Sequence, residues 1–321
     1  MMLFQFEEWR FYGFGLLMGV RNLVRNGFRL GFKKTVGKIT QPINSYCRFP
    51  EYSLMSRSID EFISEDSSGS AVRVLDVGSP KTFGLFLALN RRVEICLTDI
   101  SPLNIMEYRT MWDALREGAT GRVSFCLADA RQLPHADNYF DIIYSMSVVE
   151  HVEAPNGDVQ AVQEMVRVLK PGGLLLLSVP FGTHYMEQSR TGLRGAVQHV
   201  SEVAPHFFQR VYDRRSFEMR ILASSDALCC RRVETIWRRN LAIPMIWGSL
   251  GEDFRGAFGF LNPLLSVLLN QKAEGLAENL ECQYGPTWSP SAVYGDAVLV
   301  AQKHPGKVSA RASWGLKGID C

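Results

Sequence analysis

The sequence predicts an α/β fold, a doubly wound sheet of seven mostly parallel strands, and two of its features support this. Short apolar runs rich in β-branched residues recur along the 321 residues, as is typical of strands buried in a parallel sheet. Segments with helical spacing of apolar residues lie between these runs. Strands that alternate with helices in this way form right-handed crossover units, so successive strands end at the same edge of the sheet.

Taken in order, the predicted elements begin directly after a polar run at 64–70. The clearest helix is 157–170, where five apolar residues share one face. We expect the first five strands at 71–78, 92–99, 122–129, 139–147 and 174–181, and helices at 82–90, 104–118 and 157–170. Two later runs, 227–237 and 296–303, predict two more strands.

The predicted domain organisation has three parts. Residues 1–70 form a basic amphipathic helical extension, 71–303 form the α/β domain, and 304–321 form a flexible tail. An insert at 238–295 separates the last two strands and is expected to shape a pocket. The apolar stretch near residue 15 is interrupted by Arg21, well short of the roughly 20 residues that span a bilayer.

Charge is concentrated at the start of the chain. Residues 1–50 carry eight basic and two acidic side chains, a net +6, although the whole chain is only +2. The extension therefore either packs on the domain as a lid, which we favour, or has residues 1–48 in peripheral contact with an anionic membrane surface. A net charge of +2 gives no support for a nucleic-acid partner.

The seven cysteines include no CxxC pair, and several fall within apolar runs. This pattern predicts reduced core residues, no structural zinc site and no bound metal. A cytoplasmic location fits best, with the inner membrane surface as the alternative if the extension binds lipid. The oligomeric state stays open.

Carboxylates fall at the ends of the first three predicted strands. Asp76 and Gly78 end the first strand, Asp99 the second and Asp129 the third. In an open parallel sheet, ligands bind outside the carboxyl ends of the strands. A carboxylate there can accept hydrogen bonds from both hydroxyls of a ribose, and another from an exocyclic amine. These residues predict a nucleoside pocket.

The loop after the first strand argues against a dinucleotide. A pyrophosphate needs several glycines to approach the helix N-terminus. Here the loop reads Gly-Ser-Pro-Lys-Thr-Phe-Gly from Gly78 to Gly84, and Pro80 removes a backbone donor. A nicotinamide-dependent oxidoreductase is therefore the weaker alternative.

Four motifs resemble those of class I S-adenosylmethionine-dependent methyltransferases of the small-molecule, type 11-like branch. They are VLDVGSP, LTDIS, CLADARQLPHADNYFDIIYSMSVVEHV and EMVRVLKPGGLLLLSVP. The resemblance is strong over 72–180, and continues more weakly through FQRVYDRRSF and DAVLVAQK, which would supply the last helix and an antiparallel seventh strand. It departs from the usual pattern at Pro80 and Thr82, where glycines are common.

The resemblance implies a Rossmann-like methyltransferase fold with S-adenosylmethionine as cofactor. Gly78 would lie under the methionine portion, whose ammonium Asp76 would hold directly or through water. Asp99 would bind the ribose hydroxyls, while Asp129 and the Ala130 backbone N–H would bind the adenine. The full set implied for cofactor binding is Asp76, Gly78, Ser79, Asp99, Asp129, Ala130 and Ser145.

On the acceptor side, the resemblance implies roles for two residues after the fourth strand. His151 is the candidate base, and Glu150 its candidate orienting partner. The alternative is that His151 only shapes the turn. We expect O-methylation of a small molecule or glycan, because a base accelerates transfer to a hydroxyl. A catalytically inactive binding scaffold is the other alternative, because of Pro80.

Overall fold

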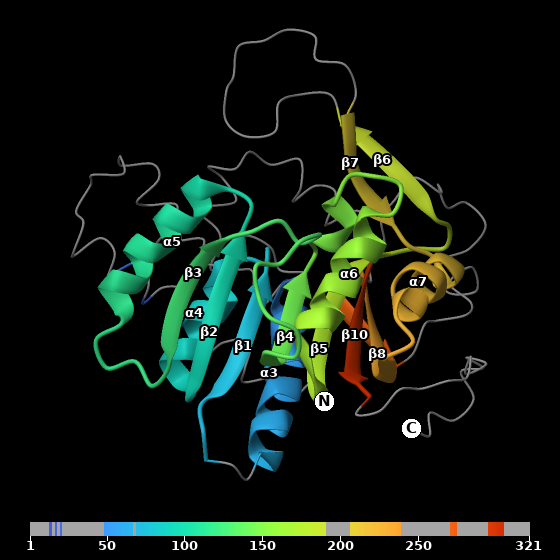
Figure 1. Cartoon of the computed structure of the whole chain (residues 1–321). Coiled ribbons are helices and arrows are strands. Elements are labelled where there is room, and N and C mark those ends of the chain that lie inside the picture. Colours follow the sequence, from blue (N-terminus) through green and yellow to red (C-terminus); the bar gives the residue numbers. More distant parts are fainter. Residues whose placement is uncertain are drawn as a thin grey trace, which may run out of the picture.

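The computed structural model describes residues 13, 14, 17, 20, 48–66, 69–190, 206–238, 270–274 and 295–304 (Figure 1). It confirms the predicted doubly wound α/β fold, and the predicted strands and helices all occur within a few residues of the expected positions. Most of the insert at 238–295 and nearly all of the tail lie outside the described residues.

The main sheet has a parallel part followed by an antiparallel part. The first five strands in its order pair in parallel, and the last three pair antiparallel with their neighbours. The order is β3 (Arg122–Leu127), β2 (Val93–Asp99), β1 (Val72–Val77), β4 (Phe140–Met146), β5 (Leu169–Phe181), β10 (Gly295–Lys303), β8 (Leu228–Arg238) and β9 (Asn270–Glu274). The edge strand β9, which falls within the predicted insert, adds an eighth strand to the seven that we expected. The strand order reverses between β1 and β4, which places a ligand crevice at their carboxyl ends.

Helices cover both faces of this sheet (Figure 1). One face packs against α3 (Arg48–Glu65), α4 (Lys81–Asn90) and α5 (Pro102–Leu115). The other packs against α6 (Gly157–Val168), α7 (Arg214–Arg220) and the short helix η2 (Leu222–Ser224). Each face has its own core of buried apolar side chains, so the sheet is buried as a parallel sheet requires.

Helix α3 belongs to the core, although it falls within the segment that we predicted as an extension. Tyr52, Leu54, Met55 and Ile59 are each at most 2% exposed and pack with the side chains of α4 and the sheet. Burying each such side chain contributes about 1.5–3 kcal/mol to the free energy of folding. The α/β unit therefore includes α3 as well as the strands that follow it.

A small second sheet stands beside the carboxyl edge of the main one (Figure 1). Its strands β6 (Met186–Arg190) and β7 (His206–Val211) form an antiparallel pair. The segment after β7 is anchored by the buried carboxylate of Asp158. This carboxylate accepts hydrogen bonds from Tyr212 Oη and Arg220 Nε, both at 2.8 Å. These hydrogen bonds tie the end of β7 to the start of α6.

Gly13, Phe14 and Leu17, from the predicted extension, lie near the opposite edge of the sheet. The Phe14 ring packs edge-on against Phe86, with 5.3 Å between centroids. Gly13, Phe14 and Leu17 line a hollow together with Leu89 and Gly118, which precede β2 and β3. A lid role for the extension stays a prediction, since the residues that would act as a lid lie outside the described part.

The prediction that all the cysteines are reduced is wrong at Cys229. Cys96, Cys126 and Cys230 are free thiols, but Cys229 is disulfide-bonded. Sequence spacing identifies pairs such as CxxC but cannot show which distant cysteines meet in the fold. Among the helices of the described residues, none has the length and apolar character needed to cross a membrane.

Candidate functional site

The turn after β1 lies close against the end of β4. Gly78 has a φ of +70°, in the left-handed region that favours glycine. A Cβ at Gly78 would approach Val148 Cγ1 to 2.7 Å, so no other residue fits without a shift. The Ser79 hydroxyl accepts a hydrogen bond from the Met146 backbone N–H at 2.9 Å, which fixes the turn to β4. The sequence predicted both Gly78 and Ser79 as site residues, and the structure places them together.

Asp76 lies beneath this turn and is fully buried. Its Oδ1 accepts a hydrogen bond from the Ser79 backbone N–H at 2.9 Å, and its Oδ2 lies 2.9 Å from Lys81 Nζ. Burial raises the pKa of Asp76, while the ion pair with Lys81 acts in the opposite direction. Both carboxylate oxygens are therefore engaged by the chain itself, so the geometry has Asp76 shaping the turn.

Pro80 fits the turn without strain. Its φ of −57° is the value that the proline ring imposes, and it caps α4 at its N-terminus. The first backbone N–H groups of a helix have no partner within the helix, so a missing N–H costs nothing here. The Pro80 carbonyl accepts a hydrogen bond from Phe83 N at 3.2 Å.

Asp99 ends β2 beside this turn. Its Oδ1 accepts from the Ser101 backbone N–H at 2.8 Å, and its Oδ2 accepts from Asn104 Nδ2 at 3.2 Å. The side chain is 12% exposed, with Lys81 Nζ 3.7 Å from Oδ2. A carboxylate can accept about four hydrogen bonds, so these two leave capacity for a ribose diol.

Asp129 follows the neighbouring strand β3 and is the most exposed of the three carboxylates. Arg131 forms a hydrogen-bonded ion pair with it, with Nη2 2.6 Å from Oδ2, and these hydrogen bonds lower the pKa of Asp129. Ala130 lies between the two residues in a half-buried turn. Because β1, β2 and β3 are adjacent, Asp76, Asp99 and Asp129 share one edge of the sheet.

Ser145 lies at the carboxyl end of β4 and is buried. Its hydroxyl donates a hydrogen bond to the Val77 carbonyl at 2.9 Å and thereby joins β4 to β1. The side chain thus supports the crevice, and its flanking contact with a cofactor stays a prediction.

The short helix η1 (Val149–His151) follows β4 and holds the two predicted acceptor-side residues. The carboxylate oxygens of Glu150 are fully buried and have no hydrogen-bond partner within the described part of the chain. Burial raises the pKa of Glu150 well above its ordinary value. Burial therefore favours the neutral form of this carboxyl.

His151 is oriented from β7. Its Nδ1 lies 2.7 Å from the Phe208 carbonyl, and its ring lies 5.0 Å from that of Phe208. A carbonyl can only accept, so Nδ1 carries the proton and Nε2 is the basic nitrogen. Nε2 is 3.7 Å from Glu150 Oε1. Adjacent residues on an α-helix would not face each other, but this 3₁₀ turn brings the two side chains together.

Three residues of this edge were missed by sequence reasoning. Lys81 is one, and Arg48 at the start of α3 is another. Arg48 Nη1 donates to the Ser147 hydroxyl at 2.5 Å and to Glu51 Oε2 at 2.7 Å. Ser147 has a φ of +48°, a strained value for a residue other than glycine, and such strain is concentrated at functional sites. Arg48 and Ser147 are 99 residues apart in the sequence, so no local pattern could reveal their contact.

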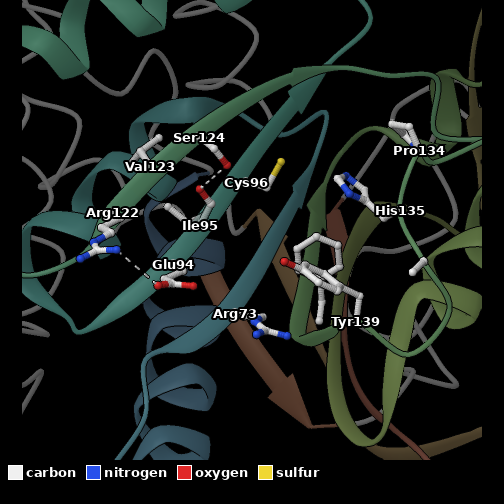
Figure 2. A pocket seen from close by; sticks show the side chains of 12 residues that line it. Arg73, Glu94, Ile95, Cys96, Arg122, Val123, Ser124, Pro134, His135 and Tyr139 are labelled. Atoms are coloured by element: carbon white, nitrogen blue, oxygen red, sulfur yellow. Dashed lines mark hydrogen bonds and ion pairs between the residues drawn. The ribbon is translucent and has the colours of Figure 1, made fainter.

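A separate cavity among the described residues lies away from this edge. Figure 2 shows this space of about 560 Å³ between the strands β1 to β3 and the loop before β4. Arg73, Glu94 and Arg122 line it from the amino-terminal halves of the strands, opposite to the edge that carries Asp99. The candidate site is therefore identified by its chemistry and by the strand order, and this cavity is separate from it.

The family model for a methyltransferase domain matches residues 75–177, which begin in β1 and end in β5. The match covers less than half of the chain, so it is a similarity of this segment to that family. Methyltransferases of this family use S-adenosylmethionine as methyl donor.

Two curated relatives match parts of this chain. A segment of 62 residues is 48% identical to Methyltransferase GfsG of Streptomyces halstedii and spans 19% of this chain and 21% of that protein. A segment of 115 residues is 37% identical to the ubiquinone/menaquinone biosynthesis C-methyltransferase UbiE of Pseudomonas aeruginosa and spans 34% of this chain and 41% of that protein. The chain thus spans less than half the length of these relatives.

Solved structures of similar shape include the [4+2]-cyclase SpnF, with a TM-score of 0.45, 21% identity, and coverage of 78% of this chain and 82% of that chain. An S-adenosylmethionine-dependent methyltransferase from Methanosarcina mazei has a TM-score of 0.44 and 14% identity, and covers 75% of this chain and 97% of that chain. The fold assignment rests on the strand order of the present chain.

The residues at the edge fit S-adenosylmethionine. The close approach at Gly78 leaves room only for bare backbone, and Asp99 keeps acceptor capacity at the ligand side. The described residues contain no group of three or more metal-binding side chains.

Proposed function

We propose that the whole chain is an S-adenosylmethionine-dependent methyltransferase that methylates an oxygen of a small molecule or glycan. The observation that carries the proposal is the position of His151. This residue follows β4, the strand that borders the cofactor crevice, and the Phe208 carbonyl holds its Nδ1 so that Nε2 is the basic nitrogen. A hydroxyl acceptor must lose its proton during transfer, and a positioned imidazole can take it.

The cofactor, when bound, supplies an electrophilic methyl group on a sulfonium. We assign the ribose hydroxyls to Asp99, and the adenine to Asp129 and the Ala130 backbone N–H. The backbone of Gly78 and Ser79 would lie under the methionine portion, with Asp76 and Ser145 holding that backbone in place. Orientation of two bound reactants supplies much of the acceleration in such transfers.

In the acceptor half, His151 Nε2 accepts the hydroxyl proton. Glu150 is the adjacent group, and its buried carboxyl oxygen Oε1 lies 3.7 Å from Nε2. The neighbouring ring of Phe208 limits rotation of the imidazole. We therefore assign Glu150 an orienting role beside the imidazole.

The replacement His151→Ala tests the role of the base. We expect kcat to fall by about 10²–10⁴-fold, because general base catalysis contributes that much, while the Kd for S-adenosylmethionine is unchanged. The matched control is His184→Ala, since His184 is exposed and contacts Thr183. Equal kcat values for His151→Ala and the wild type would remove His151 from the mechanism.

Carbon methylation is a second candidate, favoured by the similarity to the UbiE C-methyltransferase over 115 residues. His151 would serve an acceptor carbon that is activated by ionisation of a neighbouring hydroxyl. Methyl transfer from isotope-labelled cofactor to pooled acceptors, followed by heating of the product in hydroiodic acid, separates the two bond types, because O-methyl groups leave as labelled iodomethane and C-methyl groups stay on the product. A chain that binds the cofactor but transfers its methyl group to none of them would support the scaffold alternative instead.

We also propose that the enzyme acts in the cytoplasm on a small-molecule partner without nucleic acid. The basic residues before position 48 would cover the site or contact an anionic membrane surface. Sedimentation with vesicles of anionic and of zwitterionic lipid, at low and high salt, distinguishes these two roles. Salt-sensitive binding to anionic vesicles alone would favour the membrane.

A further inference from the structure

Lys81 is a buried cation at an unfavourable place. It is the first residue of α4, and its side chain is 1% exposed. The N-terminus of a helix carries a partial positive charge, which disfavours a cation. A buried ammonium also needs anionic partners to offset its lost hydration. The contacts of Lys81 must therefore account for its presence.

The ammonium group reaches oxygens from both β1 and β2. Lys81 Nζ donates to the Ser79 carbonyl at 2.6 Å and lies 2.9 Å from Asp76 Oδ2. It also lies 3.7 Å from Asp99 Oδ2. Asp76 alone would neutralise the lysine, but the side chain extends beyond it to the carboxylate at the next strand end.

The contacts of Asp99 divide into two groups. Ser101 and Asn104 donate to its carboxylate from the start of α5, and Lys81 approaches from α4. With cationic and neutral donors on the protein side, the carboxylate presents its remaining acceptor positions outward.

We propose that Lys81 is a positioning residue for the cofactor ribose, and that it acts by holding the Asp99 carboxylate in the orientation that accepts the diol. This inference rests on the proposed cofactor site. Lys81 links the turn at Gly78, which would lie under the methionine portion, to the carboxylate of Asp99, which would bind the ribose. A lysine that only neutralises Asp76 would stabilise the fold but would not distinguish between ligands by their ribose.

Calorimetric titration with two ligands tests the proposal. S-adenosylhomocysteine carries both ribose hydroxyls, and its 2′-deoxy analogue lacks one. We expect Lys81→Met to weaken binding of S-adenosylhomocysteine about tenfold, the size of one lost charge-assisted hydrogen bond, and binding of the 2′-deoxy analogue less than twofold. The control Lys170→Met removes a lysine that pairs with Asp141 at 2.5 Å near the start of β5, and should change neither affinity.

The replacement Lys81→Met leaves Asp76 buried without its cation and could prevent folding. The second comparison therefore uses Asp76→Asn with and without Lys81→Met, because the double variant buries no unpaired charge. The same selective loss for S-adenosylhomocysteine is expected between these two variants.

Equal weakening for both ligands would overturn the proposal, because it would show that Lys81 acts on the turn as a whole. Unchanged affinity for both ligands would overturn it as well, while leaving the cofactor site intact. If the wild-type chain bound neither ligand, the proposed function itself would fail.

Discussion

The carboxylates along the carboxyl edge of the sheet differ between its two halves. On the β1 to β3 side, Asp76, Asp99 and Asp129 all have hydrogen-bond or ion-pair partners within the chain. Beside the end of β4, Glu51 pairs with Arg48 at 2.7 Å, but both oxygens of Glu150 lack hydrogen-bond partners in the described residues, and its nearest ion-pair contact is His151 Nε2 at 3.7 Å. Both of these glutamates are fully buried.

This difference separates a preformed binding surface from a reactive one. Partnered carboxylates hold fixed positions, which suits a cofactor of constant shape. An unpartnered buried carboxyl costs stability, and such groups are retained where a change of protonation has a use. Under the proposed function, cofactor recognition belongs to the first half of the edge and proton chemistry to the second.

Asp99→Ala should give the largest change and tests the first half. Loss of two charge-assisted hydrogen bonds to the ribose should weaken S-adenosylhomocysteine about 100-fold or more, measured by calorimetry. The control is Asp113→Ala on the exposed face of α5, which should leave the affinity unchanged. If Asp99→Ala bound as well as the wild type, the first half would not be the cofactor surface.

Glu150→Gln tests the second half and should stabilise the protein. Burial raises the pKa of Glu150 above its ordinary value of 4.5. At a pH between the ordinary pKa and the raised pKa, the folded state holds a proton on Glu150 that the unfolded state has lost. Stability should therefore fall as the pH rises through this window. The amide removes that dependence, so we expect a gain of about 1–3 kcal/mol in the free energy of unfolding at pH 8 and little at pH 4.

Urea denaturation at the two pH values measures this gain. The matched control is Glu164→Gln in α6, whose carboxylate accepts from the Leu133 N–H at 2.9 Å and pairs with Arg167 at 2.8 Å. This variant should lose stability at pH 8. A loss for both variants would mean that Glu150 has a partner in the folded protein, and the contrast between the halves would disappear.

Asp129→Asn should have the smallest effect. The side-chain carbonyl of the introduced amide can still accept a hydrogen bond from the adenine amine, and exposed ion pairs such as that with Arg131 contribute about 0–1 kcal/mol. We expect a loss of cofactor affinity of about threefold by calorimetry. An effect larger than that of Asp99→Ala would reverse the order of importance within the first half.

Local patterns predicted the strands of the sheet and the strand ends that carry Asp76, Asp99 and Asp129. This was possible because the spacing of apolar residues within a short segment indicates its secondary structure and burial. Local patterns could not predict the partners. Phe208 fixes His151 from 57 residues away, and Arg48 reaches Ser147 across 99. Helix α3 was assigned to the extension because its apolar residues alternate with serines and charges, whereas its burial depends on the sheet it covers. Such contacts depend on the tertiary fold.

The position of β10 has a consequence for synthesis. This strand is formed by residues 295–303, near the end of the chain, yet it lies between β5 and β8 and pairs with both. Until it emerges from the ribosome, β5 has an open edge and β8 has no neighbour through which to join the sheet. Open apolar edges promote aggregation, and translation proceeds at about 5–20 residues per second. The half-made protein must therefore remain soluble for several seconds before its last strand can close the sheet.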